Sequence, residues 1–260
     1  RRQRQMCIRD SGVGDRVVGM ASTSIDYLEK YSNDASIKNL GTIKEADLEA
    51  VMECEPDIIF IGGRLSKSYD ALSEIAPVVY LATDTNEGLV NSVSKNAKTI
   101  ASIFGMEDKV DSLMSDFGAR IDAIKKISSG KTALVGMTTS GSFNLLGNDG
   151  RCSLIGVEAG FNNLTAAGST STHGNETSFE TVVKQNPDYI FVMDRDSAIS
   201  TAGAKNAKEI VENELVKTTD AYKNNHIIYL EHSNVWYTAE GGIQALDLSL
   251  IHISEPTRLR

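Results

Sequence analysis

The feature that most limits how this chain can fold is a ten-residue stretch that occurs twice. Glu55–Arg64 reads EPDIIFIGGR, and Asn186–Arg195 reads NPDYIFVMDR. In each copy Pro-Asp precedes a continuous apolar run, and arginine ends the stretch at the same offset. Such a run, bounded by turn residues, is typical of a strand in a parallel sheet that is buried on both faces. We therefore expect two similar units, each built on a parallel sheet.

Further apolar runs alternate with helical patterns around both copies. Strands are predicted at Arg16–Met20, Asp57–Ile61, Pro77–Leu81, Thr132–Met137, Ser142–Leu146, Tyr189–Met193 and Ile227–Leu230. Helices are predicted at Ser24–Tyr31, Ile43–Met52, Ser68–Ile75, Ser178–Gln185 and Ala207–Asn213. This βαβ alternation indicates the α/β class.

A long helix is predicted between the two halves. Apolar residues recur at helical spacing on both sides of Gly105, and no proline interrupts the pattern from Glu107 to about Ile127. At 1.5 Å per residue this helix would span roughly 30 Å, which is about the diameter of a small domain. The prediction is two Rossmann-like lobes with mostly parallel central sheets, residues 12–104 and 129–247, joined by one backbone helix at 105–128.

Both ends of the chain are expected to be foreign to the protein. Residues 1–11 match the translation of a sequencing adapter, and residues 248–258 match the reverse complement of its partner, which Leu259 and Arg260 continue. Such segments are left out of fold reasoning, as a tag would be. The native part is then a fragment, residues 12–247, and residues 1–11 and 248–260 are interpreted as artefacts.

The charge of the native part argues against a nucleic-acid partner. Without the two ends, 20 basic residues stand against 33 acidic ones, a net charge of −13, whereas phosphates demand a basic surface. An anionic ligand would therefore need arginines concentrated at one place. Cys54 and Cys152 lack metal-type spacing, and no apolar run approaches the roughly 20 residues of a membrane span.

Arg64 and Arg195 are the first candidates for such a concentration of charge. Each follows the carboxyl end of a predicted strand, and ligands of open parallel sheets bind at those ends. If the lobes face each other, both guanidiniums point into one cleft and clamp an anion. The alternative for each arginine is an ordinary salt bridge on the surface or between the lobes.

Several stretches give the chain a family resemblance. They are Gly63-Arg64 with Ser68-Tyr69 and Ile75-Ala76-Pro77, Ser171-Thr172-His173-Gly174, Asn186-Pro187-Asp188-Tyr189 through Asp194-Arg195, and Val235-Trp236-Tyr237 before Gly241-Gly242. Together they resemble the helical-backbone class of substrate-binding proteins that serve iron-siderophore, haem and cobalamin importers. Within that class, the chain is similar to the petrobactin- and catecholate-type siderophore-binding proteins over nearly all of residues 12–247.

The resemblance implies a function as well as a fold. It implies a monomeric binding protein, not an enzyme, that works outside the cytoplasm, in the periplasm or as a cell-surface lipoprotein. Its ligand would be an anionic ferric siderophore, with no cofactor, and its partner the permease of an ABC importer.

The resemblance also implies which residues bind. Arg64, Arg151 and Arg195 stand where that subfamily has three arginines that line the cleft and meet the ferric complex. The placement of Arg151 rests on the resemblance alone. Charge-assisted hydrogen bonds from several guanidinium forks would offset the roughly three negative charges of a ferric tris-catecholate.

His173 and Tyr237 match residues that complete the iron shell when the siderophore leaves positions open. Fe(III) is hard, so phenolate oxygen is a natural ligand and imidazole is tolerated. The alternative for His173 is a loop histidine that caps a helix near Glu176–Ser178. For Tyr237 the alternative is packing beside Trp236.

The chain departs from the family pattern in its first lobe. The first strand and helix of that lobe are expected to be missing, which would leave unpaired sheet edges. We expect the first lobe to fold poorly for this reason.

Other functions stay open on the residues alone. Cobalamin or haem binding shares the architecture. A zinc or manganese binder would need three or four converging ligands, and the native part has only His173, His226 and His232. An α/β hydrolase would need more than Gly141-Ser142, and a nucleotide-binding enzyme more than Gly62-Gly63.

Overall fold

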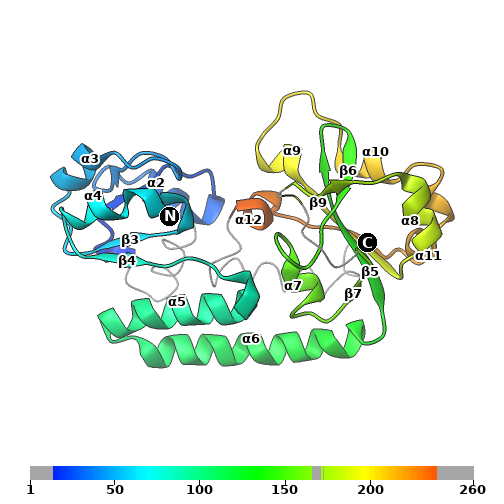
Figure 1. Ribbon diagram of the computed structural model, residues 1–260, viewed down its shortest axis with the longest axis horizontal. Coiled ribbons are helices and arrows are strands. Elements are labelled where there is room, and N and C mark those ends of the chain that lie inside the picture. The colour runs from blue at the N-terminus through cyan, green and yellow to red at the C-terminus, as the bar shows by residue number, and fades with distance from the viewer. Residues whose placement is uncertain (1–13, 166–170, 172, 239–260) are drawn as a thin grey trace. The chain divides into compact units, whose positions relative to one another are not determined.

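The computed structural model describes residues 14–165, 171 and 173–238, without the side chains of Thr85 and Thr238 (Figure 1). Residues 1–11 and 248–260, with Thr172 and Gly241-Gly242, lie outside the described residues. The described chain forms two compact units: residues 14–84 and 91–114 make the first, and residues 85–90 and 115–238, with the gaps just given, make the second.

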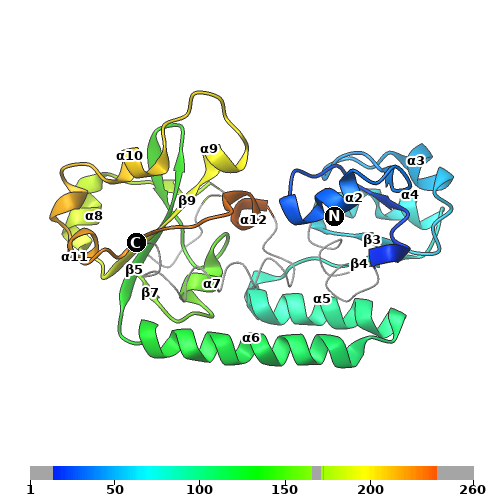
Figure 2. The ribbon, with the colours of Figure 1, turned by 180° about the vertical axis from the view of Figure 1, so that it is seen from behind.

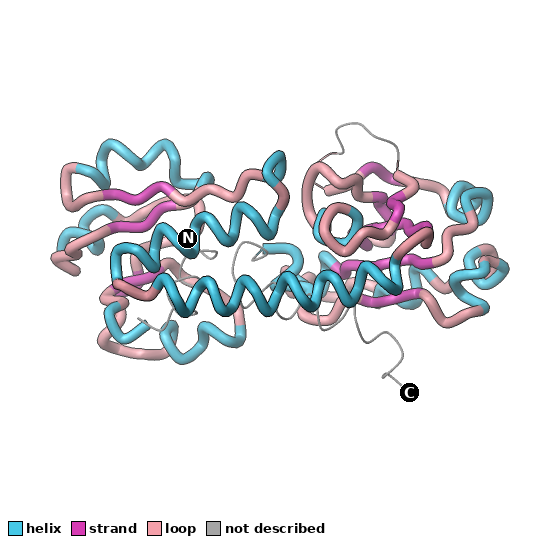
Figure 3. Tube along the Cα trace, turned by 90° about the horizontal axis from the view of Figure 1, so that it is seen from below, coloured by secondary structure: helices cyan, strands magenta, loops and turns pink. Residues whose placement is uncertain are grey.

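The predicted long helix is confirmed as α6 (Glu107–Ser128), which begins in the first unit and ends in the second (Figure 3). Its first turn carries Glu107 and Asp108 and its last turn Lys125 and Lys126. These charges complement the helix dipole. Its buried stripe, at i and i+3 or i+4 spacing, consists of Val110, Phe117, Ile121 and Ile124.

The first unit contains two separate pairs of parallel strands. β1 (Gly19–Met20) pairs with β2 (Lys38–Asn39), and β3 (Ile59–Ile61) pairs with β4 (Val78–Tyr80). The helical elements around them are η1 (Gly14–Arg16), η2 (Asp26–Leu28), α2 (Glu29–Ser32), α3 (Leu48–Glu53), η3 (Gly63–Ser68), α4 (Tyr69–Ser73) and α5 (Leu89–Phe104).

Two predicted boundaries in this unit were wrong. The helix predicted from Ile43 begins at Leu48, because the Thr42 hydroxyl accepts from the amides of Lys44 and Glu45 and holds them in a turn. The Asp47 side chain then caps α3 by accepting from Ala50 N. The strand predicted from Arg16 is only two residues long, because Gly14–Arg16 forms a 3-10 turn.

The second unit is built on one mixed sheet (Figure 2). β9 (Tyr189–Asp194) lies between β10 (Ile227–Tyr229) and β5 (Thr132–Thr139), and all three are parallel. β7 (Asn162–Asn163) adds a parallel pairing to β5, while β6 (Ser142–Leu145) and β8 (Asn175–Glu176) continue the sheet antiparallel. The apolar runs predicted as strands 132–137, 142–146, 189–193 and 227–230 therefore all lie in this sheet.

The helical elements of the second unit are short. They are η4 (Thr85–Glu87), α7 (Ser153–Gly156), α8 (Phe179–Gln185), α9 (Arg195–Ala198), α10 (Ala207–Val211), η5 (Val216–Thr218), α11 (Asp220–Lys223) and α12 (Ser233–Thr238). Leu134, Ile190 and Val192 of the sheet pack with Val182 of α8 and Val211 of α10 in one buried cluster. The α/β class with mostly parallel central strands is thus confirmed. Among the described helices, none combines the length and the apolarity that a bilayer crossing requires.

Candidate functional site

The carboxyl end of β9 presents Arg195 to a small group of polar side chains. β9 stops at Asp194, whose side chain accepts from Ser197 N (2.9 Å) and so caps α9. Because α9 begins at once, Arg195 stands directly at the edge of the sheet. Its side chain is 24% exposed, so it is held by protein but still meets solvent.

Three neighbours fix the Arg195 guanidinium. Nε donates to Tyr237 Oη and Nη1 donates to Thr139 Oγ1, both at 3.1 Å. Asp196 Oδ1 lies 3.8 Å from Nη1, while Asp196 Oδ2 accepts from Ser140 N (2.7 Å). Nη2 donates to none of the described residues, so the guanidinium keeps hydrogen-bonding capacity for a ligand.

Tyr237 is the centre of the group. It lies on α12, which packs against α9 and β9 and is anchored by the buried side chains of Val235 and Trp236. Arg151 Nε donates to the Tyr237 carbonyl oxygen (3.1 Å), and the Arg151 guanidinium carbon lies 4.3 Å from the centre of the phenol ring. The Arg195 guanidinium carbon lies 5.6 Å from the same centre. Both distances are within the range of a cation–π interaction.

His173 completes the group. Its ring lies 6.4 Å from the Tyr237 ring, at an interplanar angle of 20°. Asn144 Nδ2 donates to the His173 carbonyl oxygen (2.8 Å), and the Ser171 hydroxyl donates to the Gly174 carbonyl oxygen. Gly174 has φ +72°, and a Cβ there would come within 2.8 Å of the Leu145 carbonyl oxygen. Glycine therefore allows the His173 loop to lie close against β6.

The two arginines set the electrostatics of His173. Partial burial, and after it the charges of Arg195 and Arg151, lower the pKa of His173 below its ordinary value. The imidazole is therefore neutral at neutral pH, which is the form that binds metal ions. The helix-capping alternative for His173 was wrong, since α8 is capped by the Ser178 side chain, which accepts from Thr181 N.

The structure thus brings together four of the five predicted residues, Arg151, His173, Arg195 and Tyr237. We call them the Arg-Tyr-His cluster. Arg64, the fifth, lies in the first unit in the first turn of η3, three residues after the end of β3, and is exposed. Sequence reasoning missed Thr139, Asn144 and Asp196. The only signal for Thr139 was its place just beyond the end of a predicted strand.

The serine and histidine side chains that a hydrolase or a metal site would use have other neighbours. The Ser142 hydroxyl donates to Glu176 Oε1 (3.1 Å), so a carboxylate, not an imidazole, is its partner. His226 Nδ1 lies 3.0 Å from the Asp188 carbonyl oxygen, and its ring stacks on Tyr189. In the part of the chain that the structure describes, no three His, Cys, Asp or Glu side chains are grouped to hold a metal ion.

Comparison with known proteins identifies the family. The model of the periplasmic binding protein family matches residues 8–233, and the chain belongs to this family. The petrobactin-binding protein YclQ of Bacillus subtilis is 38% identical over 242 residues, which are 90% of this chain and 74% of YclQ.

Solved structures agree with this assignment. The crystal structure of YclQ superposes with a TM-score of 0.87 at 34% identity, covering 98% of this chain and 88% of the YclQ chain. The catecholate-siderophore binding protein VctP of Vibrio cholerae gives 0.84 at 32% identity, covering 95% and 88%.

Proposed function

We propose that this protein binds an anionic ferric siderophore of the catecholate kind outside the cytoplasm, as a monomer, and passes it to the permease of an ABC importer. The observation that carries the proposal is the Arg-Tyr-His cluster, in which two guanidiniums flank one phenol ring. YclQ and VctP are named for petrobactin and for a catecholate siderophore, which supports this ligand class. We assign the protein no catalytic role and no cofactor.

Each member of the cluster has a role in this proposal. Arg151 and Arg195 supply charge-assisted hydrogen bonds to the negative oxygens of the complex. Since the chain as a whole is acidic, with a net charge of −9, this local pair of cations selects the anion. Tyr237 Oη and neutral His173 are the groups able to reach open positions on Fe(III).

Arg64 belongs to the proposed ligand set because of the repeat. It ends the first copy of the repeated stretch as Arg195 ends the second, and it lies just beyond β3. Its guanidinium, which bonds to no residue in the described part of the chain, is a further charge-assisted donor for the anion.

Titration of the whole chain tests the proposal, with Trp236 as the reporter. Trp236 is the only tryptophan of the chain and precedes Tyr237. A ferric tris-catecholate should quench its fluorescence with one-to-one saturation. Ferric hydroxamate, haem and cobalamin should bind at least about tenfold more weakly, because they carry less negative charge than the tris-catecholate.

Two results would count against the proposal. Tighter binding of haem or cobalamin would assign the cluster to that ligand. No quenching by any ferric complex, in a chain that is folded by circular dichroism, would remove the siderophore function.

A further inference from the structure

Asn144 occupies a fixed place in the sheet of the second unit and faces away from its core. It lies in β6, where it pairs with Met137 of β5 on one side and with Glu176 of β8 on the other. Its neighbours Phe143 and Leu145 belong to the buried core cluster. Because successive side chains of a strand point to opposite faces of the sheet, the Asn144 side chain lies on the other face. Strand pairing on both sides makes its backbone a rigid base for this side chain.

The Asn144 side chain supports the turn that carries His173. Gly174 N donates to the Ser171 carbonyl oxygen (2.9 Å) and closes the turn, and Ser171 N donates to Asn175 Oδ1 (3.3 Å). These bonds are local and set the shape of the segment. The bond from Asn144 Nδ2 to the His173 carbonyl oxygen (2.8 Å) instead joins the turn to the sheet. The position of the imidazole over the sheet therefore depends on Asn144.

The turn and β6 also approach each other closely. A Cβ atom added at Gly174 would lie 3.0 Å from Asn144 Cβ, so the turn rests directly on this side chain. In this position the His173 ring lies 6.4 Å from the Tyr237 ring, at an interplanar angle of 20°. Because the contact is so close, a change of the side chain at Asn144 moves the turn, and with it the imidazole beside Tyr237.

The carbonyl half of the same amide is poorly placed for stability. Asn144 Oδ1 is buried and accepts from none of the described residues, and a buried acceptor without a donor destabilises a folded chain. His173 is exposed, so water can replace Nδ2 at its carbonyl oxygen. Asparagine therefore adds little to the stability of the fold at this position, which points to a role in the site.

We propose that Asn144 is a positioning residue: it holds the His173 imidazole where it can bind Fe(III), and so allows the protein to accept ferric complexes that leave coordination positions open. This inference rests on the proposed function. A tris-catecholate fills the octahedral shell of the iron and leaves no position for a protein ligand. A bis-catecholate leaves positions open, and the imidazole of His173 and the phenol of Tyr237 are the groups able to fill them. Groups that orient a metal-binding histidine without touching the metal typically change the metal affinity by about 10–100-fold.

Substitution of Asn144 tests this role. Asn144→Ala should weaken a ferric bis-catecholate at least about tenfold more than it weakens a ferric tris-catecholate, because only the bis-catecholate uses the imidazole. Asn144→Leu, which keeps most of the volume but has no donor, should give the same ratio of affinities. Quenching of Trp236 fluorescence measures both complexes. Ser142→Ala is the matched control and should leave the ratio unchanged, because Ser142 lies on the same face of β6 and its hydroxyl donates to Glu176.

A double substitution tests whether Asn144 acts through His173. His173→Ala alone should weaken the bis-catecholate at least as much as Asn144→Ala does. Adding Asn144→Ala to His173→Ala should cause no further loss, because the group that Asn144 positions is gone. Urea unfolding of the second unit should give Asn144→Ala the midpoint of the parent chain. A purely structural role would instead lower that midpoint and weaken both complexes alike.

The outcomes separate this inference from the proposed function. A parent chain that binds neither catecholate complex rejects both. A parent chain that binds the tris-catecholate, with equal losses for the two complexes in Asn144→Ala, overturns the role of Asn144 and leaves the proposed function in place. A parent chain that binds the tris-catecholate but not the bis-catecholate has the same meaning, as does a further loss when Asn144→Ala is added to His173→Ala.

Discussion

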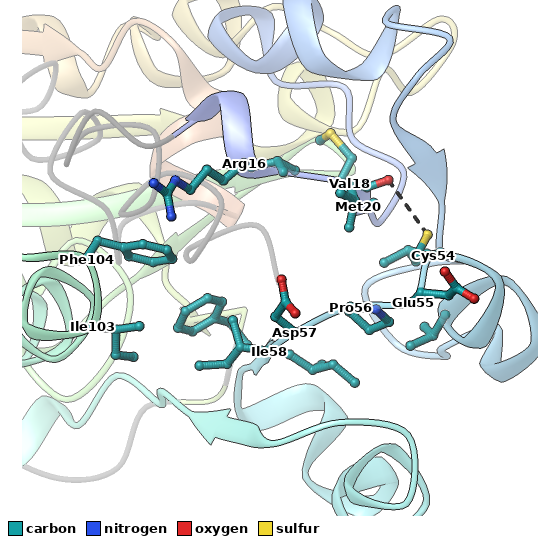
Figure 4. Close-up of a pocket in the computed structure, with 16 residues that line it drawn as sticks. Arg16, Val18, Met20, Cys54, Glu55, Pro56, Asp57, Ile58, Ile103 and Phe104 are labelled. Carbon is teal, nitrogen blue, oxygen red and sulfur yellow. Dashed lines mark hydrogen bonds between the residues drawn. The ribbon is translucent and has the colours of Figure 1, made fainter.

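The strand pairs β3–β4 and β9–β10 have the same sequence pattern and the same register but different surroundings. Beyond β9 lies β5, and the residues that follow β9 are buried or hydrogen-bonded. Arg195 is accordingly fixed by Tyr237, Thr139 and Asp196. Beyond β3 lies a cavity (Figure 4), and Arg64 bonds to no described residue. The repeat determines the strand ladder, and the side chains around the end of the strand determine whether the arginine after it is held in place.

The largest difference between the units should appear on truncating the shared phenylalanine. Phe191→Ala should destabilise the second unit by about 3–5 kcal/mol, the usual cost of removing a fully buried ring, since Phe191 packs edge-on against Phe161. Phe60→Ala should cost no more than about 2 kcal/mol, because its ring is half-buried beside the cavity. Hydrogen exchange resolved by unit measures both. Equal losses of stability for Phe191→Ala and Phe60→Ala would mean that the strand beside β9 does not set the contribution of this phenylalanine.

The two arginines should differ in binding. Arg195→Gln should weaken a ferric tris-catecholate about 100-fold, or about 2.7 kcal/mol, because it removes a prearranged donor and leaves Tyr237 Oη and Thr139 Oγ1 without their partner. Arg64→Gln should weaken binding less than about tenfold, because a guanidinium that no neighbour fixes loses conformational entropy when it binds the ligand. Calorimetric titration measures both losses of affinity. Lys184→Gln, at an exposed position of α8, serves as a control because it removes the same single positive charge. A larger loss at Arg64 would reverse the comparison.

The two aspartates of the repeat, Asp57 and Asp188, should differ in stability and in its dependence on pH. Bonds from the Thr132 amide and hydroxyl, with the charges of Lys131 and His226, lower the pKa of Asp188 below its ordinary value despite partial burial. A carboxyl whose pKa is lowered by folding stabilises the protein above its unfolded pKa, near 4. It loses that contribution as the pH falls through the folded pKa.

Asp188→Ala should therefore cost about 2 kcal/mol at pH 7 and remove part of the acid sensitivity of the second unit below pH 4. Asp57→Ala should change the stability of the first unit by less than about 0.5 kcal/mol at any pH, as for most exposed positions. Urea denaturation at pH 7, 4 and 3, followed separately for each unit, provides the measurement. An acid profile unchanged by Asp188→Ala would refute the assigned role of this carboxylate.

The sequence alone was enough to predict the helices and strands that follow from local patterns. The apolar runs and helical periodicity were sufficient for α6 and for β5, β6, β9 and β10, because burial on both faces and a 3.6-residue period leave little choice. The repeat also pointed to Arg195. It could not predict Thr139 or Asp196 as partners, because these contacts depend on the register of β5 against β9.

Other parts of the site were beyond local reasoning for a similar reason. Arg151 and Tyr237 are 86 positions apart along the chain, and no periodicity in the sequence connects them. Only the family resemblance placed them together. In the first unit, the helix predicted from Ile43 starts later because the side chains of Thr42 and Asp47 accept hydrogen bonds from backbone amides, which outweighed the helical spacing.

The most direct test of the account is to locate the ligand on the protein. Gallium(III) in place of iron(III) gives a diamagnetic tris-catecholate complex, and the guanidinium Nε–H signals of a ¹⁵N-labelled chain report on each arginine. The account predicts that the signals of Arg151 and Arg195 shift together and saturate at one equivalent, while that of Arg120 on α6 does not move. Saturable binding that leaves the Arg151 and Arg195 signals unchanged would contradict it.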